Sequence, residues 1–307
     1  MKKMRIPLIV ALGVAVIGII FGSFFDLQLS TAIANPRNMF GLTISAIFPT
    51  LGFAAVAAMG GGFVAFIVKG KYHIALKILF GVLAAACLGV AIHYPAGEYF
   101  GVNGFYWVAP KNFGYLIVLL PECAAMVGGY FLFKDYENDK LWIVFCAVVV
   151  LLLIALLGVI PVLKDMMHRP RFRFISTHEG VDFHHWWEPF KEYSDKWVKA
   201  SGFEKDDFKS YPSGHTAETS ILLVGATLFP MGSKKLRKIQ LPVFIGAGVL
   251  VMLVALARIL AAAHFLSDVS FGATIMLTLL FIANEVIANV KALHPEEKEI
   301  EQAPVEE

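Results

Sequence analysis

Long apolar runs, separated by short polar connections, make up most of this chain. Eight of them cover roughly residues 6–25, 44–68, 74–92, 115–133, 141–163, 213–230, 241–257 and 265–290. A helix needs about 20 apolar residues to cross a hydrocarbon core of about 30 Å. The pattern therefore predicts an all-α, polytopic membrane helix bundle with about eight transmembrane helices.

The composition of the chain strengthens this prediction. Hydrophobic residues make up 58% of it and charged residues 16%, whereas a soluble domain carries about 25% charged residues. Polar surface is thus too scarce for a soluble globular or a disordered protein, and a net charge of +2 offers no basic field for nucleic acid. The three cysteines lie inside apolar runs and form no disulfide framework.

The distribution of Lys and Arg predicts how the helices are oriented. Every second connection is basic, whereas the remaining short connections hold only Arg37 or Lys111. The basic group comprises Lys2, Lys3, Arg5, Lys69, Lys71, Lys134, Lys140, Lys234, Lys235, Arg237 and Lys238. Because basic connections stay in the cytoplasm, we expect a multi-pass cell-membrane protein with both termini cytoplasmic. Residues 164–212 and 258–264 are then on the opposite, non-cytoplasmic face.

Three polar islands stand at the ends of apolar runs, all on this non-cytoplasmic face. They are residues 164–171, 212–215 and 258–268. Lys164, Arg171 and Arg258 place three cations beside the bilayer, where a charge is costly and therefore indicates function. Three cations without three neighbouring carboxylates favour an anionic ligand, and the guanidinium fork suits phosphate.

The second and third islands add groups that suit phosphoryl transfer. Ser213 and Gly214 stand at a helix start, where free backbone N–H groups bind anions and glycine allows a ligand to approach closely. His264 and Asp268 are four positions apart and share a helix face, where the carboxylate can fix the imidazole tautomer. His215 supplies a second imidazole. One nucleophilic and one acid histidine beside a cluster of cations fit phosphoryl transfer.

These islands resemble the three-part signature of the type 2 phosphatidic acid phosphatase family, which includes the lipid phosphate phosphatases and is related to vanadium haloperoxidases. The family pattern is Lys, six residues, Arg-Pro; then Pro-Ser-Gly-His; then Ser-Arg, five residues, His, three residues, Asp. Phe172 replaces the family's Pro and Ala257 its Ser, and neither departure removes a charge or an imidazole. The matching positions are Lys164, Arg171, residues 212–215, Arg258, His264 and Asp268.

The resemblance implies a metal-independent phosphatase without cofactors. His264 would attack phosphorus and form a phosphohistidine, Asp268 would orient it, and His215 would protonate the leaving oxygen and then activate water. The phosphate oxygens would be held by Lys164, Arg171, Ser213, Gly214 and Arg258. The implied substrate is a lipid phosphate taken from the bilayer, such as undecaprenyl diphosphate, phosphatidate or phosphatidylglycerol phosphate.

The family's usual six spans suggest three parts in this chain. Residues 1–140 would hold N-terminal helices, with the third and fourth predicted spans as an extra pair. Residues 141–292 would form the catalytic core with the outer loop 164–212, and residues 293–307 an acidic cytoplasmic tail.

Other functions compete with this interpretation. A soluble sugar phosphate is an alternative substrate, as in the related glucose-6-phosphatases. A transporter could use intramembrane His, Arg and Asp as a relay, but the ionisable groups cluster at one face and no repeat symmetry is visible. A member that binds lipid phosphate without cleaving it would not need His215, His264 and Asp268. The sequence leaves the substrate and the oligomeric state open.

Several polar residues outside the signature have two explanations. Arg169 and Arg173 flank the first island, where they serve the site or only meet lipid headgroups. Glu122 is more readily a structural carboxylate than a functional one. Glu218 either tunes His215 or makes a helix–helix hydrogen bond.

The outer loop and the second apolar run hold further conspicuous residues. Trp186 and Trp187 fit an aromatic belt at the membrane surface. Residues 60–62 are all glycine, which permits close helix packing. The loop also holds a group without the spacing of a metal motif, namely His178, Glu179, Asp182, His184 and His185.

Overall fold

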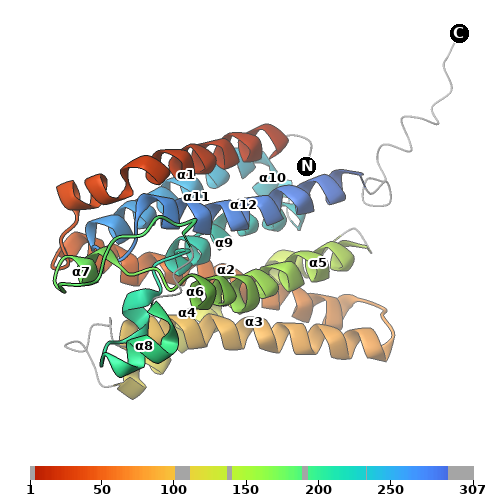
Figure 1. The fold of residues 1–307 in the computed structure, drawn as a ribbon. Coiled ribbons are helices and arrows are strands. Elements are labelled where there is room, and N and C mark those ends of the chain that lie inside the picture. The colour runs from red at the N-terminus through yellow and green to blue at the C-terminus, as the bar shows by residue number, and fades with distance from the viewer. Residues whose placement is uncertain (1–3, 101–110, 137–139, 189–192, 233, 290–307) are drawn as a thin grey trace, which may run out of the picture.

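The computed structural model describes residues 4–100, 111–136, 140–188, 193–232 and 234–289. Within these ranges the chain forms a bundle of long helices with a folded polar loop at one end (Figure 1). The long helices are α1 (Arg5–Ile33), α2 (Met39–Lys69), α3 (Ile74–Phe100), α4 (Lys111–Phe133), α5 (Leu141–Ile154), α9 (Gly214–Leu228), α11 (Gln240–Leu260) and α12 (Leu266–Asn289). The short ones are α6 (Ile160–Met167), α7 (Phe172–Ile175), α8 (Asp195–Ala200) and α10 (Lys234–Lys238).

The apolar runs fold as membrane helices. Seven helical segments among the described residues are long and apolar enough to cross a bilayer, and α5 continues through a π-helical turn (Ala155–Val159) into α6. The prediction of an all-α polytopic bundle is therefore confirmed. The predicted span 213–230 differs, because α9 has only 15 residues, which reach about 22 Å, and almost all of them are buried. It is an interior helix of the bundle.

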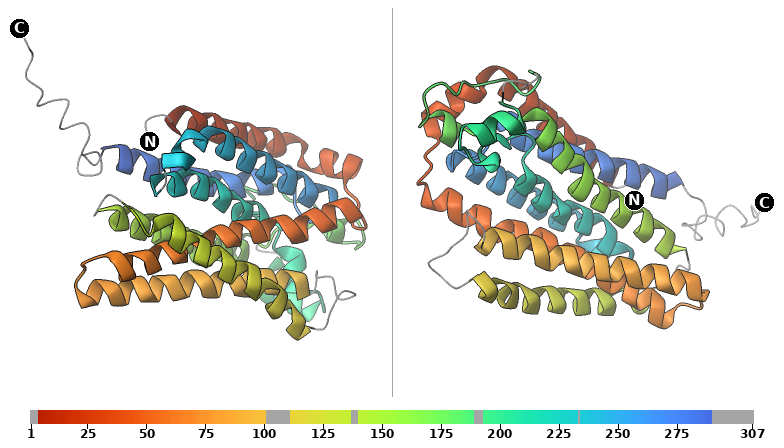
Figure 2. Two further views of the ribbon diagram at one scale, coloured as in Figure 1. Left: turned by 180° about the vertical axis from the view of Figure 1, so that it is seen from behind. Right: turned by 60° about the horizontal axis from the view of Figure 1, so that its bottom comes forward.

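α2 and α9 occupy the middle of the bundle. α9 packs against α2, α11 and α12, while α1 packs along α12. α3 and α4 lie against α2 on the side away from α1, so the third and fourth predicted spans form a layer of their own (Figures 1 and 2). The limits of the three predicted parts stay predictions, and the acidic tail over 293–307 lies outside the described residues.

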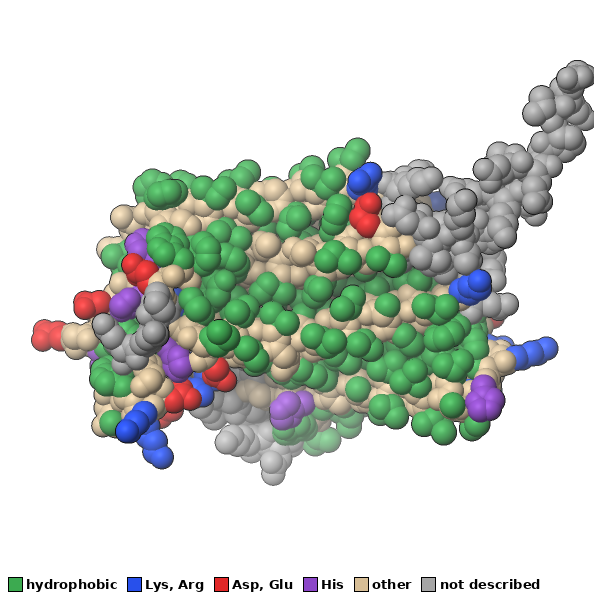
Figure 3. Space-filling model, turned by 45° about the vertical axis from the view of Figure 1, so that its right-hand side comes forward, with side chains coloured by type: hydrophobic (Ala, Val, Ile, Leu, Met, Phe, Trp, Pro, Cys, Tyr) green, Lys and Arg blue, Asp and Glu red, His purple; other side chains and the backbone are tan. Residues whose placement is uncertain are grey.

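The sides of the bundle are apolar, and charged side chains gather at its two ends (Figure 3). On α1, for example, Ile6, Ile17 and Phe24 are 73%, 66% and 67% exposed. Continuous exposed apolar surface over whole helices suits hydrocarbon rather than water. The described basic connections lie at the end of the bundle opposite the three polar islands, as the alternation of Lys and Arg predicted.

The described part of the outer loop is folded onto the end of the bundle. Its aromatic and aliphatic side chains form a small core of their own, made of Phe174, Val181, Tyr193, Val198 and Phe208. Trp197 packs against this core. Ion pairs hold its short helices together. Arg173 pairs with Asp206 (3.2 Å) and Asp207 (3.0 Å), and Lys205 pairs with Asp165 (3.3 Å) and Asp195 (2.8 Å). The loop is thus an ordered cap.

Two glycines set how closely α2 and α4 approach each other. A Cβ atom at Gly61 would overlap the carbonyl oxygen of Met126, and one at Gly129 would overlap the carbonyl oxygen of Ala58. Small residues at such positions let two membrane helices pack backbone to backbone. The close packing predicted for residues 60–62 is therefore confirmed.

This contact predicts opposite effects for two neighbouring substitutions. Gly129→Ala should destabilise the protein by about 1–3 kcal/mol, since the added methyl group forces α4 away from α2. Gly128→Ala is the matched control, because a Cβ there meets no atom within 4 Å and alanine favours the helix. Thermal unfolding in detergent measures both. Equal melting temperatures for the two variants would contradict the packing.

Candidate active site

The three polar islands meet at one end of the bundle, where backbone hydrogen bonds join them. Residues 169–171 leave α6 as a non-helical segment and run beside residues 207–210 and the turn after α11. Positive φ angles at His168 (44°) and Ala262 (56°) turn the chain at these two places. In each of these bonds a backbone amide donates to a backbone carbonyl oxygen. The pairs are Arg171 to Asp207 (2.8 Å), Ser210 to Arg169 (3.0 Å), Arg173 to Ala262 (2.8 Å) and Ser213 to Asp268 (3.0 Å).

The start of α9 forms one wall of the site. The Ser213 hydroxyl oxygen caps this helix by accepting hydrogen bonds from the Thr216 amide (3.4 Å) and hydroxyl (3.1 Å). Lys164 lies beside the helix start, since a Cβ atom on Gly214 would be only 3.7 Å from the Lys164 Cε atom. A helix N-terminus next to an ammonium group attracts anions.

All three predicted cations are drawn into the protein. Arg171 and Arg258 are 4% and 5% exposed, and Lys164 is half-buried. Lys164 donates to the Lys209 carbonyl oxygen at 2.8 Å. Arg171 binds Asp206 twice, from Nε to its carbonyl oxygen (2.8 Å) and from Nη2 to its carboxylate (2.9 Å). The outer loop therefore positions two of the three cations.

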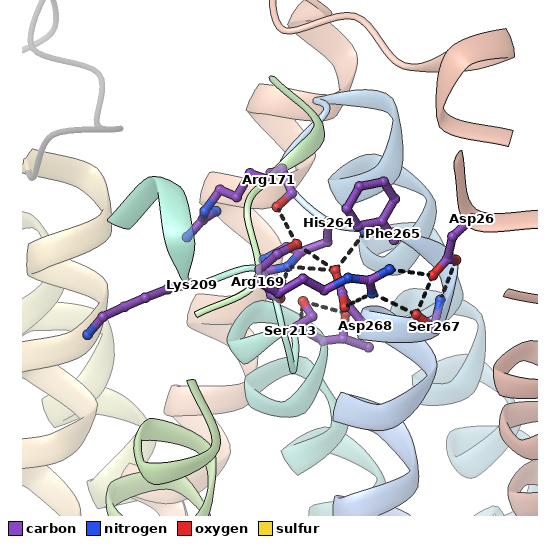
Figure 4. Close-up of polar contacts among 12 residues, drawn as sticks. Asp26, Arg169, Arg171, Lys209, Ser213, His264, Phe265, Ser267 and Asp268 are labelled. Atoms are coloured by element: carbon purple, nitrogen blue, oxygen red, sulfur yellow. Dashed lines mark hydrogen bonds and ion pairs between the residues drawn. The ribbon is translucent and has the colours of Figure 1, made fainter. Parts of the chain in front are cut away.

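His264 is held in one tautomer by the backbone. Its Nδ1 atom lies 2.6 Å from the carbonyl oxygen of Ser210, and its side chain is buried (Figure 4). A carbonyl oxygen can only accept, so Nδ1 carries the proton and Nε2 carries the lone pair. Asp268 is adjacent, with Oδ2 at 4.0 Å from Nδ1. Its predicted role in orienting His264 stays a prediction, since the direct partner in the structure is Ser210.

The surroundings keep His264 neutral. Burial lowers its pKa well below the ordinary range, and the charges of Arg258, Arg171 and Lys164 and the neighbouring His215 lower it further. A neutral imidazole has a free electron pair, which a nucleophile requires. The same cations that would bind phosphate thus also disfavour protonation of His264.

Two charged residues lie inside the site besides the predicted ones: Arg169, for which the sequence left two explanations, and Asp26, which the sequence analysis did not single out. Arg169 has no exposed surface, so the hypothesis that it only meets lipid headgroups is wrong. Its guanidinium binds Asp268 (2.5 Å) and Asp26 (3.0 Å). Asp26 belongs to α1, and the predicted first span, 6–25, ended one residue before it. A carboxylate inside a membrane helix was the available signal, because a charge there is costly.

The remaining candidates differ in their surroundings. Glu218 borders the site, since a Cβ atom on Gly214 would lie 3.4 Å from its Oε1 atom, whereas Glu122 is buried in α4. Trp186 donates from its indole to the Ser23 hydroxyl at 2.9 Å. Ring stacking engages two loop histidines, His178 on Phe174 and His185 on Trp187. Within the described ranges no group of three or more His, Cys, Asp or Glu side chains could hold a metal ion.

Comparison with known proteins identifies one family. The sequence model of the PAP2 superfamily matches residues 124–291, more than half of the chain, and this segment contains all three islands. No curated protein and no solved structure matches the chain.

The environment of His264 predicts an unusual titration. Its imidazole should take up a second proton well below the ordinary value of about 6.5, because burial and the neighbouring cations disfavour the charged form. The unfolded chain does bind this proton below about 6.5, so the folded protein should also lose stability as the pH falls through that value. Nitrogen-15 NMR of histidine-labelled protein in detergent measures the titration, and His264→Ala identifies the signal. A titration at or above about 6.5 would contradict this electrostatic environment.

Proposed function

This chain belongs to the PAP2 superfamily, and we propose that it is a membrane-embedded phosphatase that uses His264 as its nucleophile and a lipid phosphate as its substrate. Members of the superfamily are phosphatases. The apolar helices of this chain are those of a multi-pass membrane protein. The nucleophile, the independence from metal and the lipid substrate belong to the proposal.

The hydrogen bond from His264 Nδ1 to the Ser210 carbonyl oxygen carries the proposal. It directs the lone pair of the imidazole to Nε2, and the charges of Lys164, Arg171 and Arg258 lie near enough to act on this imidazole. A phosphoryl group needs an in-line nucleophile and positive charge around its equatorial oxygens, and in this proposal His264 and the three cations supply them. Lys164 and Arg171 are held by the outer loop without a substrate, so little reorganisation of these two cations opposes the proposed reaction.

The proposed reaction has two steps. In the first, His264 Nε2 forms a bond to phosphorus while the bond from phosphorus to the leaving oxygen breaks, and His215 gives that oxygen a proton. In the second, His215 takes a proton from a water molecule, whose oxygen attacks phosphorus as the phosphorus–nitrogen bond breaks. Phosphate leaves and both histidines return to their initial state. The cations, the Ser213 hydroxyl and the amides of the α9 start hold the phosphate oxygens.

The surface of the bundle favours an amphipathic substrate. The site lies at one end of helices whose sides are apolar, so a lipid could keep its chains in the bilayer while its phosphate reaches His264. Undecaprenyl diphosphate, phosphatidate and phosphatidylglycerol phosphate are the proposed candidates. In this proposal the protein lies in the cell membrane and its site is on the non-cytoplasmic face, since the basic connections lie at the opposite end of the bundle.

Substitution of the nucleophile tests the proposal. His264→Ala should lower phosphate release by at least about 1,000-fold without unfolding the protein, because the proposed reaction requires the lone pair of this imidazole to attack phosphorus. His73→Ala, an exposed histidine at the other end of the bundle, is the matched control and should keep full activity. Phosphate release from purified protein is measured over a panel of lipid monophosphates and diphosphates together with glucose 6-phosphate. Full activity of His264→Ala rejects the nucleophile, and exclusive cleavage of the sugar phosphate rejects the lipid substrate.

Inhibitors test the chemistry separately. Vanadate should inhibit, because it can accept the His264 nitrogen in place of the transferred phosphoryl group, and a chelator should leave activity unchanged. Initial rates with vanadate and with EDTA measure both effects. Loss of activity in EDTA that a divalent cation restores would contradict a metal-independent reaction.

A further inference from the structure

A fully buried arginine links three segments at the site. Arg169 donates from Nη2 to Asp26 on α1 (3.0 Å), and from Nη1 to Asp268 (2.5 Å) and to the Ser267 hydroxyl on α12 (2.9 Å). Its Nε donates to the His184 carbonyl oxygen of the outer loop at 3.0 Å. Four of the five guanidinium hydrogens are therefore engaged, which fixes the side chain in one orientation. Figure 4 shows Arg169 between Asp26, Ser267 and Asp268.

Asp268 transmits this orientation toward the nucleophile. One of its oxygens binds Arg169, and the other accepts hydrogen bonds from the Ser210 hydroxyl (2.5 Å) and the Phe265 amide (2.9 Å). Ser210 is the residue whose carbonyl oxygen holds His264 Nδ1. An unbroken chain of contacts thus runs from Asp26 through Arg169, Asp268 and Ser210 to His264.

Asp26 is the outermost member of this chain and is itself held firmly. Its carboxylate accepts hydrogen bonds from Arg169 and from both the amide and the hydroxyl of Ser267. Asp26 and Arg169 are 2% and 0% exposed, so neither charge is offset by water. Replacing such a buried ion pair with apolar residues is often neutral or stabilising, so stability alone gives no reason for it. Its position beside the nucleophile does.

We propose that Arg169 and Asp26 are positioning residues for the His264 nucleophile, with α1 supplying a carboxylate that the active site needs. This inference rests on the proposed function. It places part of the active-site support on a helix that precedes the segment matched by the superfamily model, which begins at residue 124. Asp26 holds Arg169, Arg169 holds Asp268, and Asp268 holds the Ser210 segment that sets the tautomer of His264.

The test separates positioning from simple stabilisation. Asp26→Asn keeps the size and one acceptor oxygen but removes the charge, and Arg169→Lys keeps the charge but replaces the planar fork of donors with a single ammonium group. Both should lower kcat by about 10- to 100-fold, because misplacing a reacting group has that effect, while KM changes less than about twofold. Arg5→Gln is the matched control, since it breaks an exposed pair to Glu285 (3.4 Å) between the same helices α1 and α12 at the other end. It should leave kcat unchanged.

A second measurement does not depend on turnover. Nitrogen-15 shifts of His264 should report the Nδ1–H tautomer in the wild type and a mixture of tautomers in Asp26→Asn. Unchanged kcat and an unchanged tautomer in Asp26→Asn, with only a lower melting temperature, would overturn the inference. If no phosphate ester is cleaved by the wild type but the tautomer still shifts, the proposed function fails and the positioning chain stands. The double variant Asp26→Asn/Arg169→Gln, which removes a pair of opposite charges, serves if Arg169→Lys does not fold, and the same loss of kcat is expected.

Discussion

The Asp268 carboxylate has no exposed surface. It lies where four parts of the chain meet: α1, α12, the segment after α6 and the segment before α9. A buried carboxylate is stable only when charged and polar donors surround it, and here Arg169, Ser210 and the Phe265 amide fill that role. Each donor comes from a chain segment that carries another part of the site. The hydrogen bonds to the Asp268 carboxylate therefore bring the three polar islands together.

The bundle supplies what this polar junction requires. In a bilayer every backbone group must find a partner inside the protein, and continuous helices meet that demand without help. α9 also has buried hydroxyl side chains. Thr219 and Ser220 donate hydrogen bonds to the backbone carbonyl oxygens of His215 and Thr216, one turn earlier in the helix. Thr219 and Ser220 can therefore lie in the interior near His215 with their hydroxyl groups hydrogen-bonded.

The fold class and the three islands could be predicted from the sequence because both depend on local patterns. Run length shows a membrane helix, and a spacing of four places His264 and Asp268 on one helical face. The partners of these groups could not be predicted, since they come from distant segments. The sequence around Arg169 does not indicate that this side chain contacts Asp26. The contact of His264 with the Ser210 carbonyl could not be predicted either, because every residue type has a backbone carbonyl. The length of α9 was overestimated because the apolar residues after Leu228 continue the pattern beyond the helix end.

The packing of α1 along α12 has a consequence for how the protein is made. Asp26 is synthesised 241 residues before Ser267, the residue whose amide and hydroxyl it accepts in the finished structure. Until α12 enters the membrane, α1 must carry an incompletely paired carboxylate, and Asp268 does not yet exist to receive Arg169. The geometry around His264 therefore arises only when α12 packs along α1. A chain arrested part-way through insertion has the cations and α9 but lacks the assembled site.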